Sequence, residues 1–119
     1  MRDKLEGPLK PAGVLVPIIE RVEGLSVLLT QRASHLKHHA GQVSFPGGSM
    51  EKHDDDVRAT ALRETEEEVG IAPHQVDVIG YLRSMPTITG FAVTPVVGLI
   101  RGVADFSIDR TEVEYAFEV

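Results

Sequence analysis

A single strong helix signal, in residues 54–73, constrains the fold more than any other feature of the sequence. Three consecutive aspartates, Asp54 to Asp56, offer N-cap side chains and suit the positive end of a helix dipole. Gly70 is placed as the residue just after a helix end, and Pro73 prevents continuation. We therefore expect a helix from Asp56 to Val69.

Apolar and β-branched segments on both sides of this helix predict strands. Residues 12–19 and 25–32, separated by a turn-like ERVEG, indicate a β-hairpin. The segment VSFPGG, residues 43–48, begins extended and ends in a predicted Pro-Gly-Gly turn. After the helix, residues 75–85 and 91–101 indicate strands joined by the loop PTITG. Strands, one helix and then more strands indicate an α+β or mixed α/β architecture.

The two ends of the chain carry weaker signals. Residues 1–11 indicate a loose arm, because their glycine and prolines resist regular structure. The last segment, residues 105–119, is ambiguous. A second helix to cover the other sheet face is not evident, and the chain stops at Val119, where such a helix would begin. We expect one domain over residues 1–119, with C-terminal truncation as one interpretation.

The composition excludes several classes of protein. The 119 residues contain no cysteine, which excludes disulfides, zinc–thiolate sites and cysteine nucleophiles. The net charge of −6 argues against wrapping nucleic acid but permits a small anionic substrate. No apolar run reaches the roughly 18 residues that span a bilayer, and the first residues lack the apolar core of a signal peptide. A cytoplasmic location is therefore expected, with an organelle matrix as the alternative.

The segment RETEEEVG, residues 63–70, crowds four glutamates onto the end of the predicted helix. At about 100° per residue, Glu64, Glu67 and Glu68 share one arc of roughly 100°, and the fourth points elsewhere. Like charges at these spacings cost roughly 0.2–0.5 kcal/mol per pair, and the helix dipole adds to that cost. Arg63 can neutralise only part of this charge.

A divalent cation would neutralise the glutamate cluster. Carboxylates with backbone oxygens nearby suit hard ions such as Mg²⁺ or Mn²⁺ better than zinc. The alternative, a solvated acidic face, is the commoner explanation for an acidic run alone. The Gly-rich segment and helix start just before the cluster favour the metal interpretation. A neighbouring, less polar stripe can pack on a sheet, and it consists of Ala61, Leu62, Thr65 and Val69.

Residues 47–71, GGSMEKHDDDVRATALRETEEEVGI, resemble the signature of the Nudix hydrolases, which cleave nucleoside diphosphates linked to another moiety. That pattern is Gly, five residues, Glu, seven residues, then Arg-Glu-apolar-x-Glu-Glu-x-Gly-apolar. The positions that match its second half are Arg63, Glu64, Glu67, Glu68, Gly70 and Ile71.

The first half of the signature departs from the family pattern. An aspartate replaces the first glutamate of the pattern. Which aspartate this is depends on whether the spacing is counted forward from the glycine or backward from the arginine. Counting five residues on from Gly48 gives Asp54, whereas counting back from the arginine gives Asp55, with Ser49 at the glycine position. Thr65 stands at the apolar position.

Residues 28–48, LLTQRASHLKHHAGQVSFPGG, are similar to the extra motif of the coenzyme A pyrophosphatase branch of this family. Lys37 replaces the usual arginine of that motif and keeps its charge, and the aspartate with its shifted spacing is also typical of the branch. Residues 86–100 and 112–119 resemble later strands, so the resemblance covers residues 12–119. The matching positions are Leu28, Leu29, Thr30, Arg32, Leu36, His39, Gly41, Gln42 and Phe45 to Gly48.

The resemblance implies a Nudix-type α/β/α sandwich around a mixed sheet, with a metal site on the helix. The implied cofactor is Mg²⁺ or Mn²⁺, and the implied ligands are Glu64, Glu67, Glu68 and a backbone carbonyl of Gly47 or Gly48. The implied catalytic residues are Glu64, Arg63 and Glu67. Glu64 is the preferred general base, with Glu112 or Glu114 as alternatives. Arg63 is expected to orient Glu67.

The implied substrate is coenzyme A or one of its thioesters, cleaved to adenosine 3′,5′-bisphosphate and 4′-phosphopantetheine. Its 3′-phosphate requires a cationic group, for which Arg32, Lys37 and His39 are the candidates. Alternatives are another substrate, such as ADP-ribose, NADH or a nucleoside triphosphate, or a catalytically silent module that binds nucleotides or a protein. We expect no nucleic-acid or membrane partner, and we keep homodimer formation as an alternative to a monomer.

Overall fold

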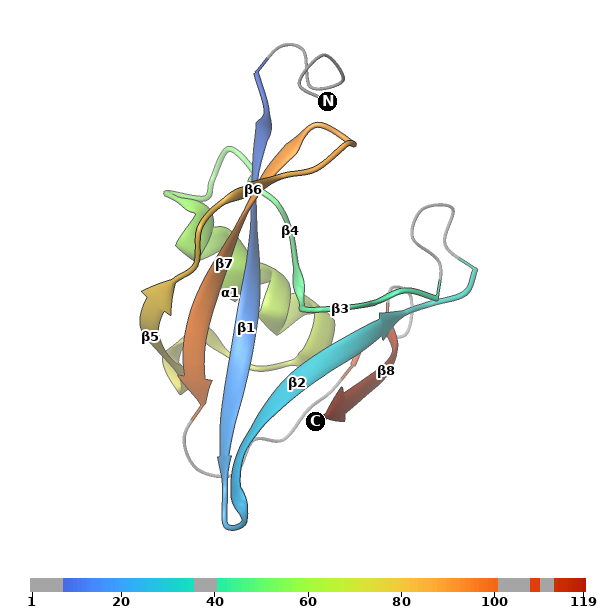
Figure 1. Ribbon diagram of the computed structural model, residues 1–119, viewed down its shortest axis with the longest axis vertical. Coiled ribbons are helices and arrows are strands. Elements are labelled where there is room, and N and C mark those ends of the chain that lie inside the picture. Colours follow the sequence, from blue (N-terminus) through green and yellow to red (C-terminus); the bar gives the residue numbers. More distant parts are fainter. Residues whose placement is uncertain (1–7, 36–40, 101–107, 110–112) are drawn as a thin grey trace.

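The computed structural model describes residues 8–35, 41–100, 108–109 and 113–119. These residues contain the α-helix α1 (Val57–Val69) and the short 3₁₀ helix η2 (Pro73–Gln75). They also form an eight-stranded sheet, shown in Figure 1. Its strands are β1 (Lys10–Arg21), β2 (Gly24–Arg32), β3 (Val43–Ser44), β4 (Gly47–Ser49), β5 (Val76–Tyr81), β6 (Met85–Pro86), β7 (Phe91–Ile100) and β8 (Val113–Glu118). A mixed sheet with one α-helix confirms the predicted α+β class.

Strand β1 organises the sheet because it pairs with three others. It runs parallel to β7 along ten residue pairs, from Lys10–Phe91 to Ile19–Ile100. It is antiparallel to β2 only near their shared turn, and beyond that turn β2 bends away to pair with β3 and β8 (Figure 1). The other end of β1 pairs with β4, and β7 pairs with β5 and β6. The predicted hairpin of the first two strands is therefore confirmed.

Local side chains set the two ends of α1. Asp56 is the N-cap, and its Oδ1 accepts a hydrogen bond from Ala59 N at 2.8 Å. At the other end Gly70 adopts φ 77°, a left-handed conformation that favours glycine, and its N–H donates to Glu66 O at 3.0 Å. Both boundaries agree with the sequence prediction.

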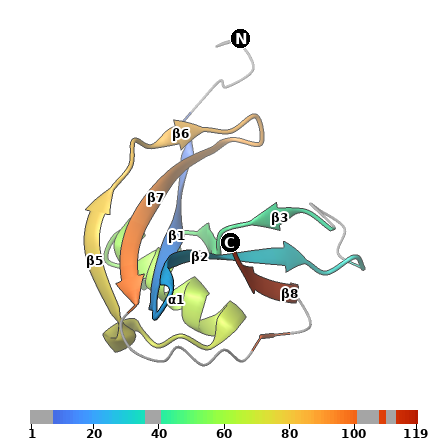
Figure 2. The same cartoon turned by 60° about the horizontal axis from the view of Figure 1, so that its bottom comes forward.

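The helix contacts β1, β4 and β7, and it lies behind β1 and β7 in the view of Figure 1 (see also Figure 2). The approach is closest at Gly13, where an added Cβ would lie 2.3 Å from Val57 O. A core of aliphatic side chains fills the layer between the helix and the sheet. Its members are Leu15, Ile19, Leu28, Ala61, Val69, Ile71, Val76, Val96 and Ile100.

The predicted Pro-Gly-Gly turn is wrong. Gly47 and Gly48 lie in β4, where they pair with Val14 and Gly13 of β1. The extended conformation depends on hydrogen bonds to a strand more than thirty residues earlier in the chain, which local turn propensity does not report. This pairing brings the two glycines beside the helix.

Other boundaries shift for the same reason. β1 begins at Lys10, inside the predicted loose arm, and the predicted strand at 75–85 divides into β5 and β6. Part of the ambiguous last segment becomes β8, which is held by β2. Within the described residues no helix is long and apolar enough to cross a membrane.

Candidate active site

A buried ion pair between Asp54 and Arg63 anchors the site. Arg63 Nε donates to Asp54 Oδ1 at 3.0 Å, and Arg63 Nη2 donates to Asp54 Oδ2 at 2.9 Å. The Asp54 side chain is 3% exposed and also accepts from Glu51 N and from the Thr60 hydroxyl, each at 2.9 Å. The hydrogen bonds from Arg63 outweigh burial and hold the pKa of the Asp54 carboxyl well below its usual range.

This ion pair distinguishes the two aspartates that the signature spacing offers. Asp54 is buried against Arg63, whereas Asp55 is exposed. Of the two candidate aspartates, Asp54 is therefore the one that contacts Arg63. Sequence reasoning missed Thr60, although its place three residues before Arg63 puts both on one helix face and could have suggested the contact.

Arg63 also contacts two of the predicted metal ligands. Its Nη1 donates to Glu64 Oε2 at 2.9 Å and to Glu67 Oε2 at 3.2 Å. The sequence suggested contact with Glu67 alone, but the closer contacts are with Asp54 and Glu64. These carboxylates raise the pKa of Arg63 above its ordinary value, with Asp54 as the largest cause. One guanidinium thus donates hydrogen bonds to three acidic side chains.

The three predicted metal ligands differ in depth. The side chain of Glu67 is 57% exposed, that of Glu64 is 17% exposed, and Glu68 is buried. Gly47 N donates to Glu68 Oε2 at 3.3 Å, which ties the helix to β4. Burial raises the pKa of Glu64, although hydrogen bonds from Glu68 and Arg63 oppose this effect. Glu64 therefore takes up a proton at a higher pH than an exposed glutamate does.

The main chain of β4 passes directly against Glu64. A Cβ added at Gly48 would lie 2.7 Å from the carboxyl carbon of Glu64 and 2.8 Å from its Oε2. Carboxylates beside bare backbone fit a hard divalent cation. Among the described residues, however, the structure contains no group of three acidic or imidazole side chains close enough together to hold a metal ion. One oxygen each of Glu64 and Glu67 accepts a hydrogen bond from Arg63 in this arrangement.

A cavity of about 460 Å³ borders the same strand. Gly13 of β1 faces the helix, while its neighbours Ala12 and Val14 line the cavity, so the cavity opens on the face of β1 opposite α1. Gly47 to Ser49 of β4 also line it. Gly48 therefore lies between the helix carboxylates and the cavity.

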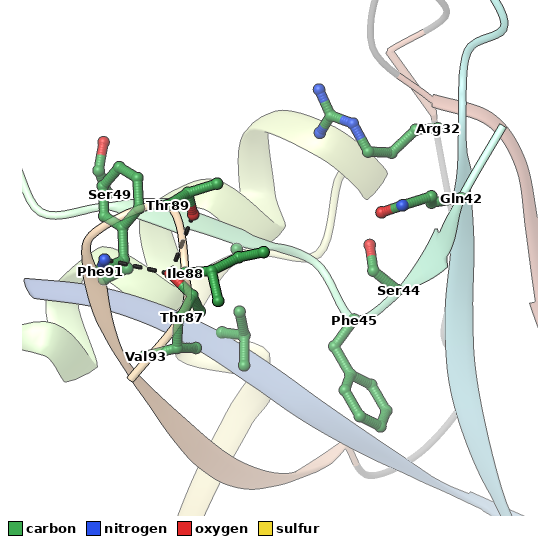
Figure 3. A pocket seen from close by; sticks show the side chains of 14 residues that line it. Arg32, Gln42, Ser44, Phe45, Ser49, Thr87, Ile88, Thr89, Phe91 and Val93 are labelled. Carbon is green, nitrogen blue, oxygen red and sulfur yellow. Dashed lines mark hydrogen bonds between the residues drawn. The ribbon is translucent and has the colours of Figure 1, made fainter. Parts of the chain in front are cut away.

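Two walls enclose this cavity, as Figure 3 shows. One consists of Arg32, Gln42, Ser44 and Phe45, and the other of Thr87 to Thr89, Phe91 and Val93. Arg32 Nε is buried and has no hydrogen-bond partner among the described residues. A buried cationic donor without a partner favours an anionic ligand.

The remaining candidates fall into two groups. Lys37, His39 and Glu112 lie outside the described residues. Glu114 lies on β8, where its Oε1 accepts a hydrogen bond from the Ser34 hydroxyl at 3.4 Å. The structure thus gathers Glu64, Glu67, Glu68 and Gly48 at one place and puts Arg32 in the adjoining cavity.

Comparison with known sequences identifies the family to which this fold belongs. The pattern of the NUDIX domain family matches residues 9–118. The chain therefore belongs to the Nudix family. It is 49% identical over 110 residues to a protein named uncharacterized Nudix hydrolase NudL from Escherichia coli O7:K1. That match covers 92% of this chain and 57% of the relative, so the chain spans a little over half of the relative's length.

Solved structures share the fold at low sequence identity. A Nudix hydrolase from M. smegmatis, RenU, has a TM-score of 0.80 and 21% identity over 95% of this chain and 71% of its own. A binary complex of the C. elegans Ap4A hydrolase has a TM-score of 0.75 and 19% identity, covering 90% and 77%. The NUDIX domain of Shewanella oneidensis NrtR complexed with ADP ribose has a TM-score of 0.67 and 19% identity, covering 99% and 76%. These likenesses show the common fold.

Proposed function

We propose that this chain is a Mg²⁺- or Mn²⁺-dependent pyrophosphohydrolase that cleaves coenzyme A or its thioesters to adenosine 3′,5′-bisphosphate and (acyl-)4′-phosphopantetheine. The observation that carries the proposal is the shared border at Gly48. A Cβ added at this residue would meet the Glu64 carboxylate, and the residue also lines the cavity. A ligand that extends from the cavity past Gly48 would bring its diphosphate to the acid cluster.

The reaction adds water across a phosphoric anhydride. Glu64, Glu67, Glu68 and the Gly48 carbonyl would hold the cation, which when bound would neutralise the diphosphate and polarise the phosphorus. Water oxygen attacks phosphorus, the bridging P–O bond breaks, and the departing phosphate keeps the bonding electrons. Glu64 would accept the water proton, and Arg63, which donates to Glu64 Oε2, would hold that carboxylate in place. Asp54 acts as a positioning residue through Arg63.

The preference for coenzyme A over other dinucleotides rests on Arg32. Arg32 lines the cavity, and its buried Nε has no hydrogen-bond partner among the described residues, which suits a phosphate remote from the scissile bond. Coenzyme A carries such a group, the 3′-phosphate. Lys37 and His39 remain candidates for the same phosphate.

The test is hydrolysis of coenzyme A with and without Mg²⁺. Glu67→Gln and Glu68→Gln should each lower kcat by about two orders of magnitude or more, because each removes a charged ligand. Glu66→Gln is the matched control, since Glu66 is exposed on the same helix, and it should behave as wild type. Equal activity in all of these proteins would rule out the ligand set.

A second arm of this experiment addresses the substrate. Wild type should cleave coenzyme A with a higher kcat/KM than the same molecule lacking its 3′-phosphate, and Arg32→Met should abolish that preference. ADP-ribose, NADH and a nucleoside triphosphate complete the panel. Faster cleavage of one of these would replace coenzyme A as the substrate while retaining the chemistry.

A catalytically silent Nudix module is the second candidate. The observation that favours it is the contact of Arg63 with both Glu64 and Glu67, which occupies oxygens that a cation would need. Such a module would bind nucleotides in calorimetry yet release no phosphopantetheine at any Mg²⁺ concentration.

A further inference from the structure

We propose that Ile88, at the tip of the β6–β7 hairpin, determines which nucleotide the cavity accepts by packing on the apolar face of the nucleoside base. The inference rests on the proposed function, since it assumes a nucleoside diphosphate derivative as the ligand. None of the contacts described above joins Ile88 to the acid cluster or to Arg32.

The hairpin that carries Ile88 is held by its own hydrogen bonds. Thr87 N donates to Phe91 O at 2.8 Å, Gly90 N donates to Thr87 O at 3.1 Å, and Phe91 N donates to the Thr87 hydroxyl oxygen at 3.1 Å. Gly90 adopts φ 92°, as the left-handed position of such a three-residue loop requires. Lys10 N also donates to Gly90 O at 2.9 Å, which attaches the loop to β1. The tip is thus pre-organised before any ligand binds.

The side chain of Ile88 is placed to meet a ligand. The residue is 81% exposed, yet it lines the cavity, and Figure 3 shows it projecting from the hairpin toward the opposite wall. An exposed isoleucine leaves apolar area in water that a ligand could cover. Val22 is equally apolar and exposed at the tip of the β1–β2 turn but lines no part of this cavity, so it provides a comparison.

The two cavity walls differ in chemistry. The hairpin side presents Ile88, Phe91 and Val93 beside two threonines, whereas the other side presents Arg32 and Ser44 beside Phe45. A moiety that packs on Ile88 needs an apolar face, and its edge needs hydrogen-bonding groups for polar lining residues such as Ser44. A nucleoside base has flat apolar faces and polar edges and meets both requirements.

Calorimetry in EDTA, where no metal-dependent turnover occurs, tests the inference. The probes are coenzyme A, which carries the base, and 4′-phosphopantetheine and inorganic pyrophosphate, which lack it. Ile88→Ala should weaken the binding of coenzyme A by roughly tenfold, since about one aliphatic side chain of contact is lost. It should leave the other two affinities unchanged. Ile88→Leu should retain most of the affinity, and Val22→Ala should bind all three as wild type.

Three outcomes would overturn the inference. They are coenzyme A affinity within twofold of wild type in Ile88→Ala, an equal loss for the probes without a base, and wild-type protein that binds no coenzyme A. The result is separable from the hydrolysis test. A chain that shows the predicted binding pattern but no Mg²⁺-dependent cleavage would contradict the proposed function and uphold the role of Ile88.

Discussion

The carboxylate of Asp54 accepts four hydrogen bonds in a position that is almost closed to water. A buried charge without partners would cost several kcal/mol, and Arg63 supplies both the opposite charge and two of the donors. The same guanidinium contacts Glu64 and Glu67, so the charge of Asp54 helps to fix the orientation of the acid cluster. Loss of that charge should therefore affect both stability and catalysis.

Asp54→Asn tests this residue, with Asp55→Asn as the matched control. The amide places an NH₂ group where a carboxylate oxygen now accepts, so at least one donor loses its acceptor. We expect a loss of about 2–4 kcal/mol in the free energy of unfolding and a reduced kcat. Asp55→Asn should change stability by less than about 0.5 kcal/mol, because its side chain is exposed. Equal effects of the two substitutions in urea titrations would contradict the assignment.

At the level of elements, the contact between α1 and β1 sets the position of the site. Gly13 allows the first turn of the helix to lie directly on the strand. From there the helix axis carries Glu64 to Gly48 and Glu68 to Gly47, so the two strands and the helix form one unit. An error in this packing would displace the carboxylates from β4.

Gly13→Ala should push the helix away from β1, since the new Cβ would lie 2.3 Å from a backbone oxygen that cannot rotate aside. We expect a loss of about 1–3 kcal/mol in the free energy of unfolding, measured in urea. Gly80→Ala in β5 is the control, because a Cβ there meets no heavy atom within 4 Å. It should be close to neutral. A Gly13→Ala protein as stable as the control would show that the helix contact tolerates movement.

For the whole molecule, the last strand closes the sheet onto the first hairpin. Glu118 on β8 accepts hydrogen bonds from Arg21 and from the Ser26 hydroxyl, and Arg21 lies 97 positions away in the chain. Just before β8 in the chain, Asp109 N donates to Glu68 O at 2.9 Å. This hydrogen bond connects the segment that leads into β8 with the acid cluster. The Arg21 contact lowers the pKa of Glu118 to about 2.

Glu118→Gln should reveal this connection through its pH dependence. The folded pKa of about 2 is below the ordinary 4.5, so the ion pair contributes its full stability above pH 4.5 and loses it as the pH falls toward 2. We expect the variant to be about 1–2 kcal/mol less stable than wild type at pH 7, with the difference shrinking at pH 4 and again at pH 3. Glu20→Gln, at an exposed position of β1, should show no such trend. A gap that is constant with pH would exclude the ion pair as its cause.

Local chemistry determined a definite part of this protein. The cap at Asp56, the left-handed Gly70 and the β-branched runs of the first hairpin act over a few residues, so α1 and the hairpin could be predicted. The Nudix resemblance identified the acid cluster in the same way, because its residues lie within one helix.

Tertiary structure decided what depends on residues far apart in the chain. β4 is extended because β1 pairs with it, Asp54 rather than Asp55 is buried against Arg63, and the cavity combines residues 42–45 with 87–93. Backbone propensity acts between neighbours, whereas burial and strand pairing are properties of the assembled fold. The sequence alone therefore determined which groups are present, and packing decided which of them meet.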